Sequence, residues 1–525
     1  MADSRASTMV EAGGTDQQPK SSSRSPSVHR GEKSSDNTVD LELAISDVGD
    51  KDVKVPEESR DPNIVDWDGP DDPQNPLNWT IKKKVMIVSS IAIITFITPL
   101  GSSMFAPGVA DVMREFQSHS PELASFVVSV YLLGYAFGPL ILAPMSELYG
   151  RSPVYHVCNV FFVVFNVACA VANSLDSLIV FRFFAGVAGS APLTIGAGSM
   201  ADMIRQEKRG AAMAAWALGP LLGPVIGPIA GGYLTEAKGW RWTFWVLAIV
   251  SGAITINTFI FMRESYHPIL LARKTKRLIK ETGNQNLRSA LDRGIEPKQL
   301  ILQSIIRPTK MLFCSPIVFL LSLYVAVVYG YLYLLFTTIS SVFHDQYNFS
   351  QGNVGLAFLG IGIGSVGGLG FISIVSDRLL KKLSAKSGEM KPEYRLPPLI
   401  PGGLFIPVGL FWYGWTAEYG VHYIVPIIGT FFVGVGMIVT MMATSTYLVD
   451  AYTIHAASAM AANTLLRSVI GAVLPLGGLR MYETLGLGWG NSLLAFIALA
   501  LVPLPVIFFR YGERIRTSKR FQMTF

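Results

Sequence analysis

Long apolar stretches recur along most of the chain, and short polar segments separate them. Each stretch holds roughly 20 mostly apolar residues, the length that a helix needs to cross about 30 Å of hydrocarbon. The pattern predicts an all-α integral membrane protein with twelve transmembrane helices. The candidate spans are 85–107, 123–143, 154–173, 178–201, 211–235, 240–262, 314–341, 352–375, 397–417, 421–449, 458–482 and 491–510.

The polar segments divide the chain into five regions. The segment 1–80 is Ser-rich and charged, with too little apolar surface to fold alone, so we expect a disordered cytoplasmic tail without the apolar core of a signal peptide. A basic linker separates two sets of six spans. The regions are the tail 1–80, a first six-helix half 81–262, the cytoplasmic linker 263–313, a second six-helix half 314–512 and a short cytoplasmic tail 513–525.

The two sets of six spans resemble each other, which indicates an internal duplication. SELYGR follows the second span and SDRLLKK follows the eighth, and they place Glu147 and Asp377 at matching positions. The interval between these two acids nearly equals the interval from Val85 to Cys314, where the first and seventh spans begin. Two similar halves with a site between them near the membrane midplane form a known transporter architecture.

Composition and charge agree with a membrane protein. Hydrophobic residues make up 50% of the chain, charged residues 15%, and the mean hydropathy is +0.40. The net charge of +6 does not indicate nucleic-acid binding, because 26 Lys and Arg flank one side of the spans and about four the other. Basic loops stay in the cytoplasm, so both termini should be cytoplasmic. The three cysteines lie in apolar stretches and give neither a disulfide framework nor a metal-ligand spacing.

The fifth span contains an unusual repeat. Residues 218–234 read LGPLLGPVIGPIAGGYL and place glycine before proline three times. Backbone groups in hydrocarbon need partners, so the stretch must remain helical, and a stripe of glycines lets another helix approach closely. We expect a bent helix with a tight, dry interface formed by Gly219, Pro220, Gly223, Pro224, Gly227, Pro228, Gly231 and Gly232.

Several segments together carry a family resemblance. GPLLGPVIGPIAGG is similar to the antiporter motif in the fifth span of the drug:proton antiporter branch of the major facilitator superfamily. LAPMSELYGRSPV resembles the superfamily's loop motif between spans 2 and 3, with Glu147, Gly150 and Arg151 in place, whereas Ala143 and Ser152 depart from it.

Further motifs extend the resemblance over residues 65–520. RFFAGVAGSAPLTIG resembles the span 4 motif, with Arg182 at its arginine position. WDGPDDPQNPLNW, GWRWTFW and AMAANTLLRSVIGAVLPL are typical of fungal members. The resemblance implies the major facilitator fold, efflux activity of the fungal multidrug or toxin type, and a role for Arg182 in proton coupling.

Charged residues within spans are costly and indicate function. Arg467 lies about ten residues, or roughly 15 Å, into the eleventh span. Arg182 lies close enough to the end of its span to reach the interface. We expect acids and arginines at the inner span ends, Glu147 with Arg151 and Asp377 near Arg378, to pair in one state and part in another. The alternative is that Glu147 and Asp377 only cap helices or pair permanently.

The proton carrier cannot be named from the sequence. Every Asp and Glu associated with a span lies at a span end, with Asp202 and Asp450 inside and Asp111 and Asp345 outside among the candidates.

Isolated polar groups among apolar residues indicate a pocket for a lipophilic or amphipathic organic molecule. Packing or a place in the membrane-interface belt remains the alternative for each tyrosine. The proposed cavity residues are Tyr131, Tyr135, Asn257, Tyr329, Tyr333 and Asn463.

The chain carries no Walker loop, no GxSxG, no HExxH and no Cys/His cluster, so we expect no enzyme, no cofactor and no metal. We expect a monomer in the plasma membrane that exports a drug, toxin or secondary metabolite in exchange for protons. A proton-coupled nutrient importer is the alternative, and a non-transporting sensor is a third possibility.

Overall fold

The computed structural model describes residues 63–205, 209–292, 294 and 296–518. The predicted disorder of residues 1–62 lies outside this part of the chain. Six spans form the first half of a helical bundle, and a short surface helix, α3 (Val109–Glu115), follows the first of them. The spans are α2 (Ile81–Ser103), α4 (Pro121–Leu148), α5 (Arg151–Ala170), α6 (Leu175–Gly189) with α7 (Ala191–Met203), α8 (Arg209–Lys238) and α9 (Arg241–Phe261).

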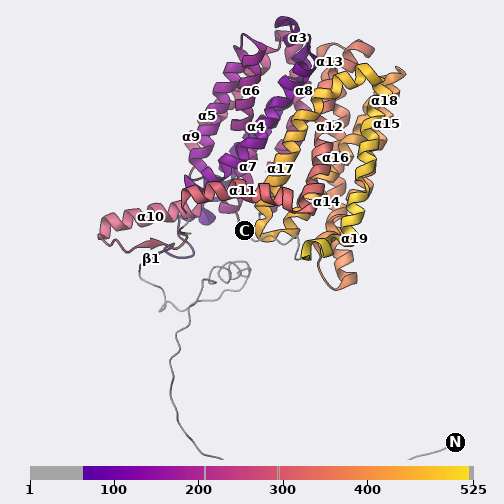
Figure 1. Cartoon of the computed structure of the whole chain (residues 1–525). Helices are drawn as coiled ribbons and strands as arrows, with labels where there is room; N and C mark the ends of the chain where they lie inside the picture. Colours follow the sequence, from indigo (N-terminus) through magenta and orange to yellow (C-terminus); the bar gives the residue numbers. More distant parts are fainter. Residues whose placement is uncertain (1–62, 206–208, 293, 295, 519–525) are drawn as a thin grey trace, which may run out of the picture. The chain divides into compact units, whose positions relative to one another are not determined.

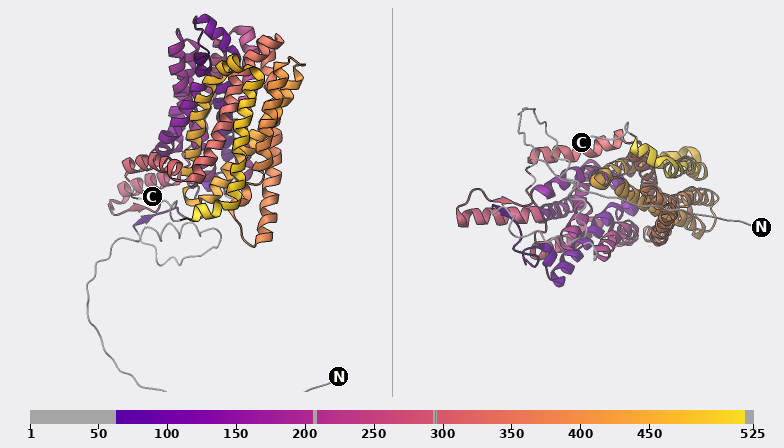
Figure 2. Two further views of the ribbon diagram at one scale, coloured as in Figure 1. Left: turned by 45° about the vertical axis from the view of Figure 1, so that its right-hand side comes forward. Right: turned by 90° about the horizontal axis from the view of Figure 1, so that it is seen from below.

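The second half repeats this arrangement beside the first, as the colours of Figure 1 and the views of Figure 2 show. Its elements are α12 (Pro316–Tyr347), α13 (Gln351–Ala357) with α14 (Leu359–Ser387), α15 (Leu399–Glu418), α16 (Ile424–Ala451), α17 (Ala456–Val473), α18 (Gly478–Leu501) and α19 (Pro503–Thr517).

Eleven continuous helical stretches among the described residues are long and apolar enough to cross a membrane. The last of them, Ala456–Thr517, has 62 residues, far more than the roughly 20 that one crossing needs. Gly486 interrupts it with φ 78° and ψ 172°, a backbone conformation that ends one crossing and begins the next. The twelve predicted spans are thereby confirmed.

Ser–Pro pairs begin two of these helices. Ser120 accepts a hydrogen bond from Leu123 N, and Ser315 accepts one from Val318 N. The proline that follows each serine occupies the first helical position, where its missing N–H costs nothing. The capped ends fix where α4 and α12 begin.

The duplication appears in matching backbone contacts. Gly134 of α4 lies against the carbonyl of Phe183 in α6, and Gly364 of α14 lies against the carbonyl of Phe431 in α16. The interval between these two glycines equals the interval between the repeated acids Glu147 and Asp377. The halves therefore share one helix-packing scheme.

The linker contains two helices that the sequence analysis did not assign, α10 (His267–Thr282) and α11 (Pro297–Cys314). Both are basic amphipathic helices, and they carry too many charged residues to be predicted as membrane spans. α11 packs against α4, α12 and α17. We call the end of the bundle that carries α10 and α11 the linker end, and the opposite end, with α3 and α13, the α3 end (Figure 1).

The structure differs from the predicted tail over residues 63–80. β1 (Ile64–Val65) pairs in parallel with β2 (Arg288–Ser289) in the linker, and a short 3-10 helix spans Pro76–Asn78. This segment has few apolar residues, but it gains order from hydrogen bonds and ion pairs with the linker, which composition alone does not reveal.

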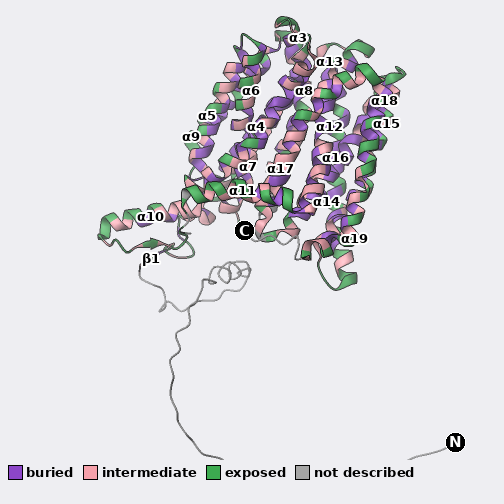
Figure 3. Cartoon of the chain, viewed as in Figure 1, coloured by how far each residue is buried: buried purple, intermediate pink, exposed green. Residues whose placement is uncertain are grey.

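Burial divides each helix between the core and its outer face. Exposed large apolar residues such as Ile256, Phe259 and Ile363 lie on helices whose opposite faces are buried, and Figure 3 shows this alternation along the bundle. An apolar outer face suits contact with lipid.

The glycines of α8 lie against another helix. A β-carbon placed on Gly219 would be 2.8 Å from Phe96 N, and one on Gly223 would be 2.9 Å from Leu100 N. Gly227 and Gly231 meet Ser103 and Met104 in the same way. The stripe therefore holds α8 against the backbone of α2, with no room for a side chain.

We predict that Gly223→Ala destabilises the protein, because the added methyl meets backbone that cannot move aside. Overpacking of this kind costs about 1–3 kcal/mol. Thermal unfolding of the purified protein in detergent measures the change. Gly252→Ala in α9 is the matched control, since nothing lies within 4 Å of its β-carbon and the helix gains about 1 kcal/mol of propensity. Equal melting temperatures for the two variants would refute the packing argument.

Candidate functional site

Arg182 is enclosed in the first half. Only 1% of the residue is exposed, and its Nη2 donates hydrogen bonds to the carbonyls of Ser102 at 3.1 Å and Val128 at 3.2 Å. Its guanidinium carbon lies 4.8 Å from the ring centre of Phe105, with Tyr131 and Phe244 also within 6 Å. The expectation that Arg182 reaches the membrane interface is wrong, because carbonyls and aromatic rings hold it inside the bundle.

Four of the predicted cavity residues form two tyrosine pairs. The rings of Tyr131 and Tyr135 in α4 are 5.1 Å apart, and those of Tyr329 and Tyr333 in α12 are 5.2 Å apart. Tyr333 Oη lies 3.0 Å from Ser102 Oγ of the first half. The tyrosines of the two halves therefore face a shared interface.

Two polar residues of α17 join this cluster. The guanidinium carbon of Arg467 lies 5.1 Å from the ring centre of Tyr329. Asn463 precedes Arg467 by one helical turn and is fully buried. Asn257 lies elsewhere, since its amide donates to Ser90 Oγ at 3.0 Å and joins α9 to α2.

Charged clusters at the linker end match between the halves. Arg151 Nε lies 3.2 Å from Asp202 Oδ2, and its Nη1 donates to Ser146 Oγ at 2.6 Å. Arg395 uses the same atoms, with Nε 3.0 Å from Asp450 Oδ2 and Nη1 3.2 Å from Ser376 Oγ. Each half thus ties its own helices together with one arginine.

These clusters differ from the expected pairs. Arg151 points to Asp202 rather than to Glu147, which lines a small cavity of about 220 Å³ with Tyr266 and Asp292. The turn at Gly150, with φ 102°, places Arg151 at the start of α5 beside α7.

In the second half, Asp377 pairs with Arg395 at 2.6 Å, and Arg378 is exposed. Arg395 was not singled out in the sequence, because it lies in the polar segment after span 8, in a short 3-10 helix 18 residues beyond Asp377. The proposed gating roles of all these residues remain predictions.

Glu264 is a further residue that the sequence analysis did not single out. Its carboxylate accepts hydrogen bonds from Arg151 N at 2.9 Å and Ser152 N at 3.2 Å, the first amides of α5. A carboxylate at a helix N-terminus satisfies unpaired donors and complements the helix dipole. Glu264 lies in RESYHP, directly after span 6, and an acid beside the end of a span was the available signal in the sequence.

Hydrogen bonds join the two halves at the α3 end. Gln351 Nε2 donates to Asp111 Oδ2 at 2.6 Å, and Gly352 N donates to Glu236 Oε2 at 2.7 Å. A β-carbon on Gly355 would lie 2.6 Å from the carbonyl of Pro228, so α13 and α8 touch through their backbones.

Between described residues, the hydrogen bonds that join the two halves lie at the α3 end or within the bundle. Those within the bundle are Ser102 to Tyr333 and Ser129 to the carbonyl of Ala472. At the linker end the charged clusters stay within their own halves. Among the hydrogen bonds between described residues, those at the α3 end therefore fasten the two halves to each other.

Comparison with known proteins agrees with this architecture. The family model of the Major Facilitator Superfamily matches residues 91–475. The chain belongs to this superfamily. It is a membrane transporter, not an enzyme.

Its relatives are fungal transporters. The chain is 68% identical over 489 residues to MFS-type transporter penM of Penicillium rubens, covering 93% of this chain and 96% of that protein. It is 54% identical over 469 residues to efflux pump radE of Floropilus chiversii, covering 89% of this chain and 87% of that protein.

Solved structures share the superfamily fold. The partially occluded inward open xylose transporter XylE from E. coli has a TM-score of 0.60 at 14% identity, covering 82% of this chain and 99% of that chain. A bacterial homolog of the human lysosomal transporter Spinster has a TM-score of 0.58 at 12% identity, covering 85% and 100%. At such low sequence identity, the likeness to these structures is evidence for the fold alone.

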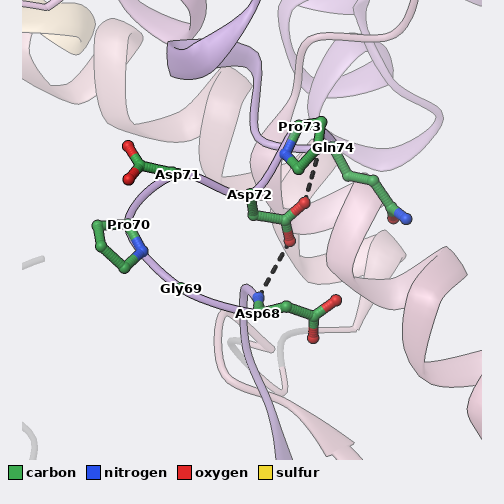
Figure 4. Close-up of a pocket in the computed structure, with 7 residues that line it drawn as sticks. All are labelled: Asp68, Gly69, Pro70, Asp71, Asp72, Pro73 and Gln74. Atoms are coloured by element: carbon green, nitrogen blue, oxygen red, sulfur yellow. Dashed lines mark hydrogen bonds between the residues drawn. The ribbon is translucent and has the colours of Figure 1, made fainter.

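A loop ahead of the first span packs against the linker between the two halves. Asp72 accepts hydrogen bonds from Asp68 N at 3.0 Å and Gln74 N at 2.8 Å, the two dashed lines in Figure 4, and lines a pocket with its neighbours. Lys274 of α10 reaches Asp68 at 2.6 Å and Asp72 at 3.7 Å. Burial raises the pKa of Asp72, but the two amides and Lys274 outweigh it and hold the pKa below its ordinary value.

The lowered pKa of Asp72 makes docking of this loop sensitive to acid. Its stabilisation is complete above the ordinary carboxyl pKa and is lost as the pH falls through the lowered folded value. We predict faster hydrogen exchange at the amides of Asp68 and Gln74 in acid, after correction for the intrinsic rate. In Asp72→Asn the corrected exchange should be fast at neutral pH too, with little further pH dependence. An acid response that persists in Asp72→Asn would contradict the assignment.

Proposed function

We propose that this protein exports small lipophilic organic compounds, such as a drug, toxin or secondary metabolite, across the plasma membrane in exchange for protons. The observation that carries the proposal is the difference between the two ends of the bundle. Carboxylates of the first half hold the second half at the α3 end, whereas the charged clusters at the linker end each stay within one half. Two similar halves that fasten at alternate ends give alternating access.

The bridges at the α3 end offer a way to couple transport to protons. Asp111 and Glu236 accept hydrogen bonds across the interface, and a hydrogen bond to a charged carboxylate is roughly twice as strong as a neutral one. Protonation of either carboxylate therefore weakens the hydrogen bonds that hold the halves together at the α3 end. With the basic linker in the cytoplasm, as the positive-inside rule favours, the α3 end would face outside the cell, and external protons would favour outward opening.

The aromatic interior supports a lipophilic substrate. Four tyrosines from two helices face the interface between the halves, where they offer apolar ring surface and a few hydroxyl groups.

The membrane potential adds a driving force of about 2.3 kcal/mol for each charge moved through 100 mV. A monomer that binds substrate, protons and surrounding lipid needs no cofactor for this cycle.

Expression in yeast cells that lack their main drug pumps tests the proposal. We expect cells loaded with a panel of lipophilic compounds to retain at least one of them severalfold less when the protein is present. A protonophore should abolish the difference. Lys276→Ala, which removes an exposed cation from α10, is the control and should behave as the wild type.

Two outcomes of this experiment would overturn the proposal. Greater accumulation under an inward proton gradient would indicate an importer. Unchanged retention across the panel, with the protein at the cell surface, would indicate that it is not a general exporter of lipophilic compounds.

Glu236→Gln tests the coupling. The amide cannot lose or gain a proton at this site, so we expect export to depend less on external pH than in the wild type, by severalfold across one pH unit. Asp176→Asn is the matched control, because Asp176 is an exposed acid in the first turn of α6 and does not bridge the halves. An unchanged pH profile in Glu236→Gln would exclude this carboxylate from coupling.

A further inference from the structure

Several buried polar atoms near the interface of the halves have no hydrogen-bond partner among the described residues. They are Oδ1 and Nδ2 of Asn463, Nε of Arg467 and Oη of Tyr135. An unsatisfied buried polar group costs roughly 1–3 kcal/mol, and such groups in native proteins call for an explanation. Buried polar atoms without a partner also occur in other helices, but these three residues bring an amide, a guanidinium and a hydroxyl that a ligand could meet.

The geometry places these groups together. Arg467 lies over the ring of Tyr329, and Asn463 lies one turn away on the same helix. Tyr135 lies three residues beyond Leu132 on α4, and therefore on the same face of that helix. A β-carbon on Gly471, one turn beyond Arg467, would lie 3.0 Å from both Leu132 and Tyr329. Helices α4, α12 and α17 thus converge on one cluster.

The charge of this region is one-sided. Arg182 and Arg467 are, among the described residues, the two cations that lie within the spans away from their ends, and Arg182 has hydrogen bonds to carbonyls rather than to a carboxylate. Within the described part of the chain, the acidic residues of the spans lie at the ends, as Glu122, Asp202, Glu236 and Asp450 do. Low dielectric strengthens the field of an uncompensated cation. The interior therefore repels organic cations and attracts negative charge.

We propose that the cluster of Arg467, Asn463 and the tyrosines binds organic anions in which a carboxylate, phenolate or enolate is carried on an apolar, preferably aromatic, body. The oxygen accepts hydrogen bonds from the Arg467 guanidinium and the Asn463 amide, and the body packs on the rings of Tyr329 and Tyr135. The substrate class rests on the proposed export function, although binding itself does not depend on transport. The negative interior of a cell favours export of an anion.

Three probes of equal chain length separate charge from size. They are 1-pyrenebutyrate, 1-pyrenebutanol and 1-pyrenebutylammonium, titrated against the full chain in phosphatidylcholine nanodiscs. Energy transfer from the protein's nine tryptophans to pyrene reports binding, and empty nanodiscs give the background. We expect the butyrate to bind at least tenfold more tightly than the alcohol and the ammonium.

Variants assign the preference to the cluster. Arg467→Ala should abolish the tenfold preference, and Arg467→Lys should retain part of it. Asn463→Asp places a carboxylate beside Arg467, so it should remove butyrate binding and raise ammonium binding above that of the wild type. This variant keeps the proposal testable if Arg467→Ala fails to fold. Lys276→Ala should leave all three affinities unchanged.

Each result decides between the two proposals. Equal affinities for the three probes, or tighter binding of the ammonium, would overturn the anion site even if export of other compounds were observed. A butyrate preference that survives Arg467→Ala would also overturn it. A preference lost in Arg467→Ala, without export of any panel compound from cells, would keep the site and reject the export function.

Discussion

Low polarity inside the bundle decides where each charge lies. A buried cation needs hydrogen bonds or aromatic rings to remain there, and Arg182 has both, from two carbonyls and three rings. Carboxylates instead collect at the two ends, where they bind helix amides, arginines or the opposite half. This division leaves two cations inside the bundle and the carboxylates at its two ends, and the proposed gating and binding both depend on it.

Close helix contact is the second condition for this arrangement. Gly134 with Gly186, and Gly364 with Gly434, bring pairs of helices together through their backbones in the same way in each half. The halves differ at the buried cation. The position that corresponds to Arg182 in the second half, by the interval that relates Gly186 to Gly434, is Thr430. A symmetric scaffold thus carries an asymmetric interior.

The sequence predicts what depends on neighbouring residues, and not what depends on distant ones. Hydropathy gave the spans, and the Gly-Pro repeat indicated the close contact of α8. The partner of Arg151 could not be predicted, because Asp202 lies 51 residues away and reaches it only once α5 and α7 pack. The order of residues 63–80 depends on Lys274, which lies far later in the chain. The amphipathic helices α10 and α11 were missed because their many basic residues are equally typical of a polar linker without helices.

The same contacts explain how the α3 end and the interior act together. Ser102 binds Arg182 through its carbonyl and Tyr333 through its hydroxyl, so one residue of α2 touches the buried cation and the opposite half. The next residue, Ser103, lies against Gly227 of α8, the helix that also meets α13. Separation of the halves at the α3 end must therefore break the Ser102–Tyr333 contact and free Tyr333, whose ring neighbour Tyr329 supports Arg467. A proton that loosens the α3 end would in this way alter the proposed substrate site, without any direct contact between the proton and that site.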